Sequence, residues 1–125
     1  MAKRILILDD DQDIRYFCSV IFESLDFDVV SSSKSENILE LVAKVKPDLI
    51  LIDNRMPVLA GSEATKVLKS NARFKKIPVI LFSAGHDLEE IAQKAKADAY
   101  LKKPFDLSDI EHLVCSLLKM KPAKH

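Results

Sequence analysis

Polar side chains that could perform chemistry follow four short apolar runs of this chain. Asp9 and Asp10 come directly after the first run, Asp53 after the second, Ser83 after the third and Lys103 close behind the fourth. The four runs are Ile5–Leu8, Leu49–Ile52, Val79–Phe82 and Tyr100–Leu101. Unbroken runs of branched apolar residues are typical of strands buried on both faces of a parallel sheet. Because ligands of open α/β sheets bind beyond the carboxyl ends of the strands, we expect these side chains to meet at one rim.

Neighbouring carboxylates repel one another, and each raises the pKa of the others unless a cation binds between them. Asp9, Asp10, Asp53 and Lys103 together carry a formal charge of −2, which one divalent ion would neutralise. Oxygen ligands with an open coordination position favour Mg²⁺, which commonly works beside phosphate. The set therefore indicates a phosphoryl-transfer site with a carboxylate as the nucleophile, assisted by the metal ion and the lysine.

Each of these residues also has a simpler interpretation. Acidic residues after a strand are often helix caps or partners of the helix dipole, which is the preferred interpretation for Asp11 and Asp13. An aspartate after an apolar strand is commonly a turn residue, Ser83 could begin a loop, and Lys103 could be a solvated surface lysine. These independent explanations would have to hold at four strand ends together, so a shared site is the better hypothesis.

The elements that would position these residues alternate between strand and helix five times. Apolar spacing predicts helices over 12–25, 35–45, 62–71, 87–96 and 107–119, and strands near 4–8, 27–31, 48–52, 77–82 and 98–102. Ser33 and Glu36 form a possible capping box, and Asp106 can cap the last helix. The alternation predicts a doubly wound α/β domain. The first strand–helix turn has acids where a dinucleotide-binding turn needs glycines, which argues against a dinucleotide or flavin phosphate.

Length and composition indicate one domain, which we expect to cover residues 1–120, followed by a basic tail at 121–125. Nineteen basic residues balance nineteen acidic ones, so no net field attracts nucleic acid or a membrane surface. No apolar stretch approaches the ~20 residues that span a bilayer, and the residues Met1–Ile5 show no signal-peptide pattern. Cys18 and Cys115 lie on apolar helical faces, which favours buried free thiols in a reducing compartment, so we expect a cytoplasmic protein.

The motifs that contain these residues resemble one family over essentially the whole chain. They are Ile5–Asp10, Leu51–Pro57 with Gly61, Phe82–Ala84, and Ala99–Phe105. In this order and at these spacings the chain resembles the receiver domain of two-component response regulators, the CheY-like family. The resemblance implies a flavodoxin-like (βα)5 domain with the parallel strand order 2-1-3-4-5, which is the family's known order.

The resemblance also implies roles for the acidic residues. Asp53 is similar to the phosphoacceptor, which takes a phosphoryl group from a histidine kinase or a phosphotransfer protein. Asp10 is similar to a direct Mg²⁺ ligand and Asp9 to one that acts largely through water. Asp53 and the backbone carbonyl of Arg55 complete the protein's share of the metal ligands.

The remaining site residues follow in the same way. Ser83, Ala84 and Lys103 resemble residues that bind the phosphoryl group, and the bond from Lys103 to Pro104 is expected to be cis. Tyr100 resembles an aromatic residue that moves together with the switch hydroxyl of Ser83.

Two residues stand at positions that vary in the family and are thought to tune hydrolysis of the phosphoryl group. They are Arg55, two residues after the acceptor, and Gly85, two residues after the switch hydroxyl. Arginine could shield the phosphate or pair with it, and glycine offers no side chain to orient water, so their net effect has no predicted sign.

The sequence thus favours a signalling module that catalyses only its own phosphoryl transfer and dephosphorylation. We expect it to act through the surface of residues 87–96 and 100–119, on a downstream protein or a second copy of the chain. One alternative is an aspartyl-phosphate hydrolase, but Asp13 stands where that motif has Thr or Val, and the chain lacks room for a cap domain. A second is an N-terminal receiver fragment of a larger regulator. A degenerate receiver is least favoured because every rim residue is present.

Overall fold

The computed structural model describes residues 2–120 and contains a parallel sheet with the strand order β2-β1-β3-β4-β5. The strands are β1 Arg4–Leu8, β2 Asp28–Ser32, β3 Leu49–Asp53, β4 Val79–Ser83 and β5 Ala99–Lys102. The helices are α1 Gln12–Ser24, α2 Ile38–Val45, α3 Gly61–Lys69, α4 Leu88–Ala95 and α5 Leu107–Leu118. The predicted fold class and strand order are confirmed. The expected basic tail, 121–125, lies outside the described residues.

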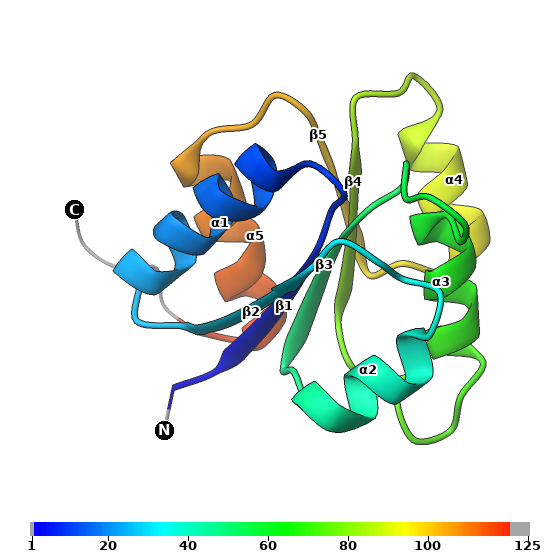
Figure 1. Ribbon diagram of the computed structural model, residues 1–125. Coiled ribbons are helices and arrows are strands. Elements are labelled where there is room, and N and C mark those ends of the chain that lie inside the picture. The colour runs from blue at the N-terminus through cyan, green and yellow to red at the C-terminus, as the bar shows by residue number, and fades with distance from the viewer. Residues whose placement is uncertain (1, 121–125) are drawn as a thin grey trace.

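Helices cover both faces of the sheet (Figure 1). Helices α1 and α5 pack on one face, and α2, α3 and α4 pack on the other. All of β3 and β4 and the last four residues of β1 are buried, as unbroken apolar runs predict for central strands. The outer strand β5 alternates between half-buried and exposed residues, because Ala99 and Leu101 pack against the core on the α1 and α5 side while Tyr100 and Lys102 point to the opposite face.

Two of the predicted caps are confirmed and one is wrong. The Asp11 side chain accepts a hydrogen bond from the Asp13 N–H at the start of α1, and Asp106 forms a capping box at the start of α5. The predicted capping box of Ser33 and Glu36 does not form, because α2 begins only at Ile38. The segment before it is used for a tertiary contact instead: the buried hydroxyl of Ser35 donates to the carbonyl of Leu59, 2.5 Å away.

The two cysteines are free and buried. Burial raises the pKa of the Cys18 thiol to about 12, so this thiol stays protonated and packs as an apolar group. No helix within residues 2–120 combines the length and the apolar character needed to cross a membrane.

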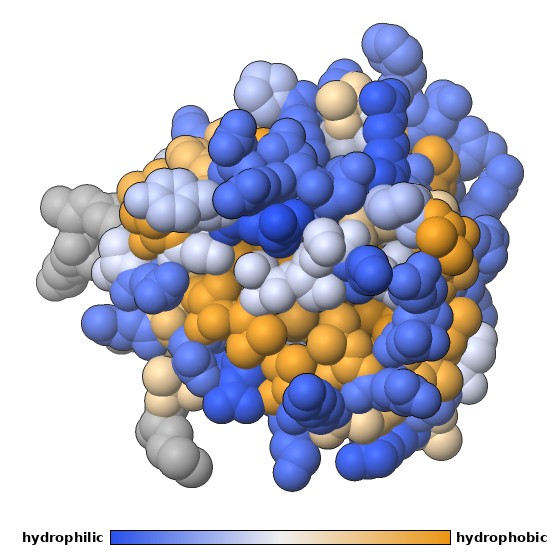
Figure 2. All heavy atoms as spheres, in the orientation of Figure 1, coloured by the Kyte–Doolittle hydropathy of each residue, from blue (hydrophilic) through white to orange (hydrophobic). Residues whose placement is uncertain are grey.

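Register brings the carboxyl ends of the central strands together. Leu8 of β1 pairs with Ile52 of β3, and Asp53 pairs with Phe82 of β4. Hydrophilic residues gather at this end of the sheet, in the upper part of the view in Figure 2. The residues that follow these strands therefore share one edge of the molecule.

Candidate functional site at the carboxyl edge of the sheet

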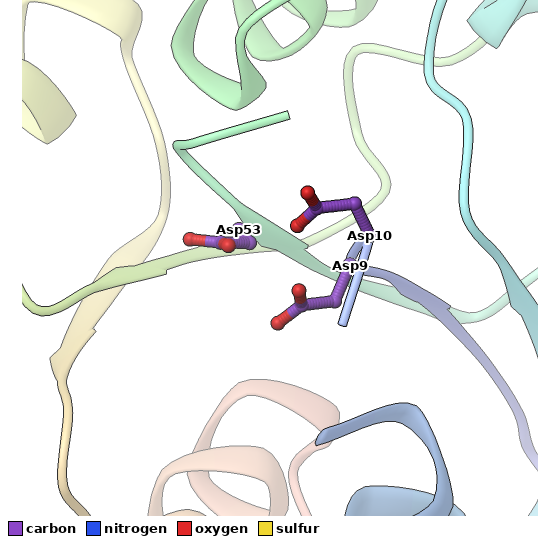
Figure 3. A group of neighbouring side chains, drawn as sticks. All are labelled: Asp9, Asp10 and Asp53. Carbon is purple, nitrogen blue, oxygen red and sulfur yellow. The ribbon is translucent and has the colours of Figure 1, made fainter. Parts of the chain in front are cut away.

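Three aspartates from two neighbouring strands form the centre of the site. Asp9 and Asp10 follow β1, and Asp53 is the last residue of β3. Each offers a carboxylate oxygen, and these oxygens all lie within 4.8 Å of one another. Figure 3 shows the three side chains pointing to the same side from the ends of their strands. The structure thus brings the predicted acidic residues together.

The three carboxylates differ in exposure. Asp9 and Asp53 are buried and Asp10 is exposed. One oxygen of Asp9 accepts a hydrogen bond of 2.9 Å from the Asp11 N–H, which fixes the buried side chain. A cluster of carboxylates that is open on one side suits a hard cation with oxygen ligands and water in the open positions. The residues present therefore fit a divalent ion such as Mg²⁺.

Lys103 reaches this cluster from the loop that follows β5. Its Nζ lies 3.0 Å from Asp9 Oδ2 and 3.5 Å from Asp53 Oδ2. Its backbone N–H donates to the carbonyl of Ser83, 2.9 Å away, and its bond to Pro104 is cis. The ammonium group is therefore shared by the two buried carboxylates, and its loop is tied to the end of β4.

The pKa of Asp9 is raised above its ordinary value. Burial is the largest cause, and the negative charge of Asp53 adds to it. The hydrogen bond from the Asp11 N–H and the interaction with Lys103 lower the pKa in part. Because a bound cation favours the ionised form of its ligands, a divalent ion at this edge would oppose the effect of burial.

Ser83 is the last residue of β4 and is buried. Its Oγ accepts a hydrogen bond of 3.2 Å from the Gly85 N–H, so the hydroxyl hydrogen can still be donated to another group. Ala84, which follows, is exposed. The hydroxyl therefore links the strand end to the loop that leads into α4.

Arg55 and Gly85, the two residues without a predicted effect, lie close to each other. The Arg55 N–H donates to Asp53 Oδ1 over 3.3 Å. A Cβ added to Gly85 would lie 3.9 Å from Nη2 of Arg55 and 3.6 Å from the Ser83 oxygen. The missing side chain of Gly85 thus leaves space that is bordered by the Arg55 guanidinium group and the Ser83 hydroxyl.

Tyr100 is the predicted site residue that lies away from the acidic cluster. It sits in the outer strand β5, opposite Leu81 of β4, and is 43% exposed. Tyr100 lines two surface grooves, one with residues of α4 and one with residues of α5, and Leu113 lines both. The structure therefore places Tyr100 on an outer surface beside the site.

Two contacts in the site were not predicted from sequence. Arg15 donates from Nη1 to the backbone carbonyl of Asp9 over 2.7 Å. The ring of Phe82 lies against the ammonium group of Lys103, with 4.6 Å from Nζ to the ring centroid. A phenylalanine in an apolar strand indicates core packing, and an arginine in a helix indicates a solvated face, so the sequence carried no signal for either contact.

Comparison with known proteins gives relatives for nearly the whole chain. The Regulatory protein AtoC of Escherichia coli is 32% identical over 124 residues, which are 98% of this chain and 26% of AtoC. The Sporulation initiation phosphotransferase F of Bacillus subtilis is 30% identical over 123 residues, 97% of this chain and 98% of that protein. Two further relatives match this chain over only 16% and 12% of their own length. The chain therefore spans about a quarter or less of AtoC and of these two proteins.

A solved structure has the same fold. The receiver domain of the sensor histidine kinase PA1611 from Pseudomonas aeruginosa, with a magnesium ion coordinated in its active site cleft, is 23% identical with a TM-score of 0.86. The match covers 95% of this chain and 99% of that domain. The family model of the response regulator receiver domain matches residues 5–115. A match over so much of its length shows that the chain belongs to the family of response regulator receiver domains.

Proposed function

We propose that this receiver domain, which we take to be residues 1–120, accepts a phosphoryl group on Asp53 from the phosphohistidine of a histidine kinase or phosphotransfer protein. One observation carries the proposal: Lys103 Nζ lies between Asp53 Oδ2 and Asp9 Oδ2, at 3.5 and 3.0 Å. A carboxylate nucleophile, an acidic cation site and a lysine thus share one edge of the sheet. The kinship with a phosphotransferase of similar length supports the same role.

In the proposed reaction an Asp53 oxygen attacks phosphorus and forms an acyl phosphate. The bond from phosphorus to the donor's histidine nitrogen breaks, and its electron pair stays on the imidazole. Four groups would hold Mg²⁺: Asp10 directly, Asp9 through water, Asp53, and the backbone carbonyl of Arg55. The bound ion would supply positive charge that neutralises the transferring group. Lys103 contributes a further positive charge to the phosphoryl oxygens.

The chain's own catalysis is limited to this transfer and to hydrolysis of the resulting acyl phosphate. In hydrolysis, water attacks the phosphorus, the bond from phosphorus to the Asp53 oxygen breaks, and inorganic phosphate leaves the free carboxylate of Asp53. Arg55 and Gly85 border the space beside the acceptor. We expect the hydrolysis rate to depend on how these two residues admit water to the phosphoryl group.

The proposed setting of the protein is the cytoplasm. Its two cysteines are free and buried, which fits a reducing compartment.

The proposed output surface is the face formed by α4, β5 and α5. The Ser83 hydroxyl and the Ala84 backbone would bind the new phosphoryl oxygens, which draws the start of the β4–α4 loop toward Asp53. The Ser83 carbonyl accepts from the Lys103 N–H, so a shift of this strand end reaches the end of β5. Tyr100 can then change its exposure between α4 and α5, which would alter binding of a downstream protein or a second copy of the chain.

Intact mass spectrometry tests the acceptor. After incubation with acetyl phosphate and Mg²⁺, the wild-type chain should gain one phosphoryl group and the Asp53→Asn variant none. Phosphate release that continues over many turnovers on simple phosphomonoesters would favour the hydrolase alternative. A second acidic residue labelled to the same extent as Asp53 would contradict the proposal.

A further inference from the structure

The ammonium group of Lys103 has an aromatic neighbour in addition to its two carboxylate partners. Its Nζ lies 4.6 Å from the centroid of the Phe82 ring. A lysine ammonium within about 6 Å of a ring centroid is attracted by the negative face of the ring. The Lys103 side chain is only 20% exposed, and such interactions are stronger where water is excluded.

The Phe82 ring is held in place by its surroundings. The side chain is fully buried in β4, where its residue pairs with Asp53 of β3 on one side and Leu101 of β5 on the other. The ring meets that of Phe105 edge to face, with centroids 6.1 Å apart and planes at 79°. Because Phe105 follows Lys103 by two residues, the loop that carries the lysine also fixes the ring beside it.

Core packing alone does not require an aromatic residue at this position. The other buried apolar residues of β4, Val79–Leu81, are aliphatic. Phenylalanine adds a face that attracts a cation and has no formal charge. A carboxylate in its place would pair with the ammonium and compete with phosphoryl oxygens for it, whereas the ring leaves the full charge available.

We propose that Phe82 is a positioning residue for Lys103, whose ring holds the ammonium group between Asp9 and Asp53 where phosphoryl oxygens arrive. The inference rests on the proposed phosphorylation of Asp53. Lysine has a flexible four-carbon side chain, so without the ring the ammonium group can turn toward solvent or pair with Asp9 alone. The rate of phosphoryl transfer then falls although every residue that touches the phosphoryl group is still present.

A first test uses the resting protein without metal or phosphodonor. Protons near the face of an aromatic ring resonate upfield, so the ε-methylene protons of Lys103 should lie upfield of those of the exposed lysines. The shift should vanish in Phe82→Leu and remain in the control Phe22→Leu. Phe22 is equally buried on the same side of the sheet and meets Phe27 edge to face at 6.0 Å. A wild-type Lys103 without this shift would overturn the inference.

A second test separates the ring's charge distribution from its volume. Successive fluorination of the phenylalanine at position 82 keeps the ring's shape and weakens its negative face. The rate of labelling by acetyl phosphate at saturating Mg²⁺ should fall with each fluorine, and in Phe82→Leu it should fall roughly tenfold, within the range of a desolvated cation–π contact.

The control Phe22→Leu should keep the wild-type rate despite a comparable loss of stability. Equal rates across the fluorinated series, or an equal loss in Phe22→Leu, would show that Phe82 acts only through packing. If the wild-type protein is not labelled at all, the proposed function fails, and the resonances of Lys103 still decide the position of its ammonium group.

Discussion

Asp9 is a buried carboxylate at a rim that would need it ionised. Burial is the main cause of its raised pKa, and the Asp11 N–H and Lys103 offset this only in part. In the metal-free protein, Asp9 therefore binds a proton more tightly in the folded state than in the unfolded state. Its contribution to stability declines as pH rises from its unfolded pKa through its higher folded pKa. Above this pH range the ionised Asp9 side chain destabilises the folded protein, and a bound cation can offset this destabilisation.

We predict that Asp9→Asn stabilises the metal-free protein at neutral pH and flattens the decline of stability across that acidic window. With Mg²⁺ at a hundred times its Kd, the wild-type protein should gain about 2.7 kcal/mol, because the ion binds only the folded state. Asp9→Asn should gain less at the same concentration. Thermal unfolding between pH 4 and 7, with EDTA and with Mg²⁺, measures both effects. An asparagine variant that is less stable than the wild type in EDTA at neutral pH would contradict the prediction.

The site residues that were predictable from sequence are those whose chemistry is unusual at the end of an apolar strand. Asp9, Asp53 and Lys103 could be identified because each follows such a run, and parallel strands end at a common edge. Arg15 and Phe82 could not, because their roles are contacts with Asp9 and Lys103 that only the folded chain creates. Hydrophobic periodicity predicts which face of a helix or strand a residue occupies. It does not predict which residue of another element it contacts there.

At the scale of elements, the start of α3 is fixed against the end of β3. The Gly61 N–H donates to the Asn54 carbonyl, and the Asn54 side chain accepts from the Ser62 N–H, each over 3.0 Å. A Cβ added to Gly61 would collide with the carbonyl oxygen of Asp53 and lie 2.9 Å from the Asn54 Cα. These are backbone atoms, so the helix or the strand end must shift.

We predict that Gly61→Ala destabilises the protein by about 1–3 kcal/mol, the usual cost of overpacking, and slows labelling of Asp53 because its backbone is displaced. Denaturant unfolding and acetyl phosphate labelling measure the two effects. Gly85→Ala is the matched control for stability, since its Cβ would meet the Ser83 oxygen at an ordinary 3.6 Å. Equal stabilities of the two variants would show that the close approach of α3 to β3 is not restrictive.

The positions of the elements followed from hydrophobic patterning to within two residues, except at the start of α2. Strands β1, β3 and β4 are buried on both faces, so their composition marks them clearly. The start of α2 was predicted three residues too early, because Ser35 and its polar neighbours fit a helix start in local terms. The hydroxyl of Ser35 binds instead to Leu59, 24 residues away, and such a contact leaves no periodic signal.

At the scale of the molecule, the acidic rim and the outer surface of β5 are joined by the end of β4. Ser83 contacts both parts: its hydroxyl accepts from Gly85 at the loop into α4, and its carbonyl accepts from Lys103 at the end of β5. The proposed phosphorylation would add negative charge and acceptor oxygens at Asp53. If Ser83 moves toward those oxygens together with the end of β4, its contacts with Gly85 and Lys103 are displaced as well, so a local change of charge can alter a surface that includes Tyr100.

We predict that beryllofluoride with Mg²⁺, a phosphoryl mimic at Asp53, shifts backbone amide resonances at the rim and also across α4, β5 and α5. In Ser83→Ala the rim should still respond, because Asp10 and Lys103 remain, while the response of α4, β5 and α5 is lost. Asp53→Asn should show neither response. A threonine at position 83 would have a methyl group that packs and fixes its hydroxyl, and serine lacks this group. We therefore expect the two states of the wild-type protein to be close in energy, with amide resonances between those of the inactive and the fully active state. Wild-type shifts confined to the rim would leave a protein that is phosphorylated but has no switch of this kind.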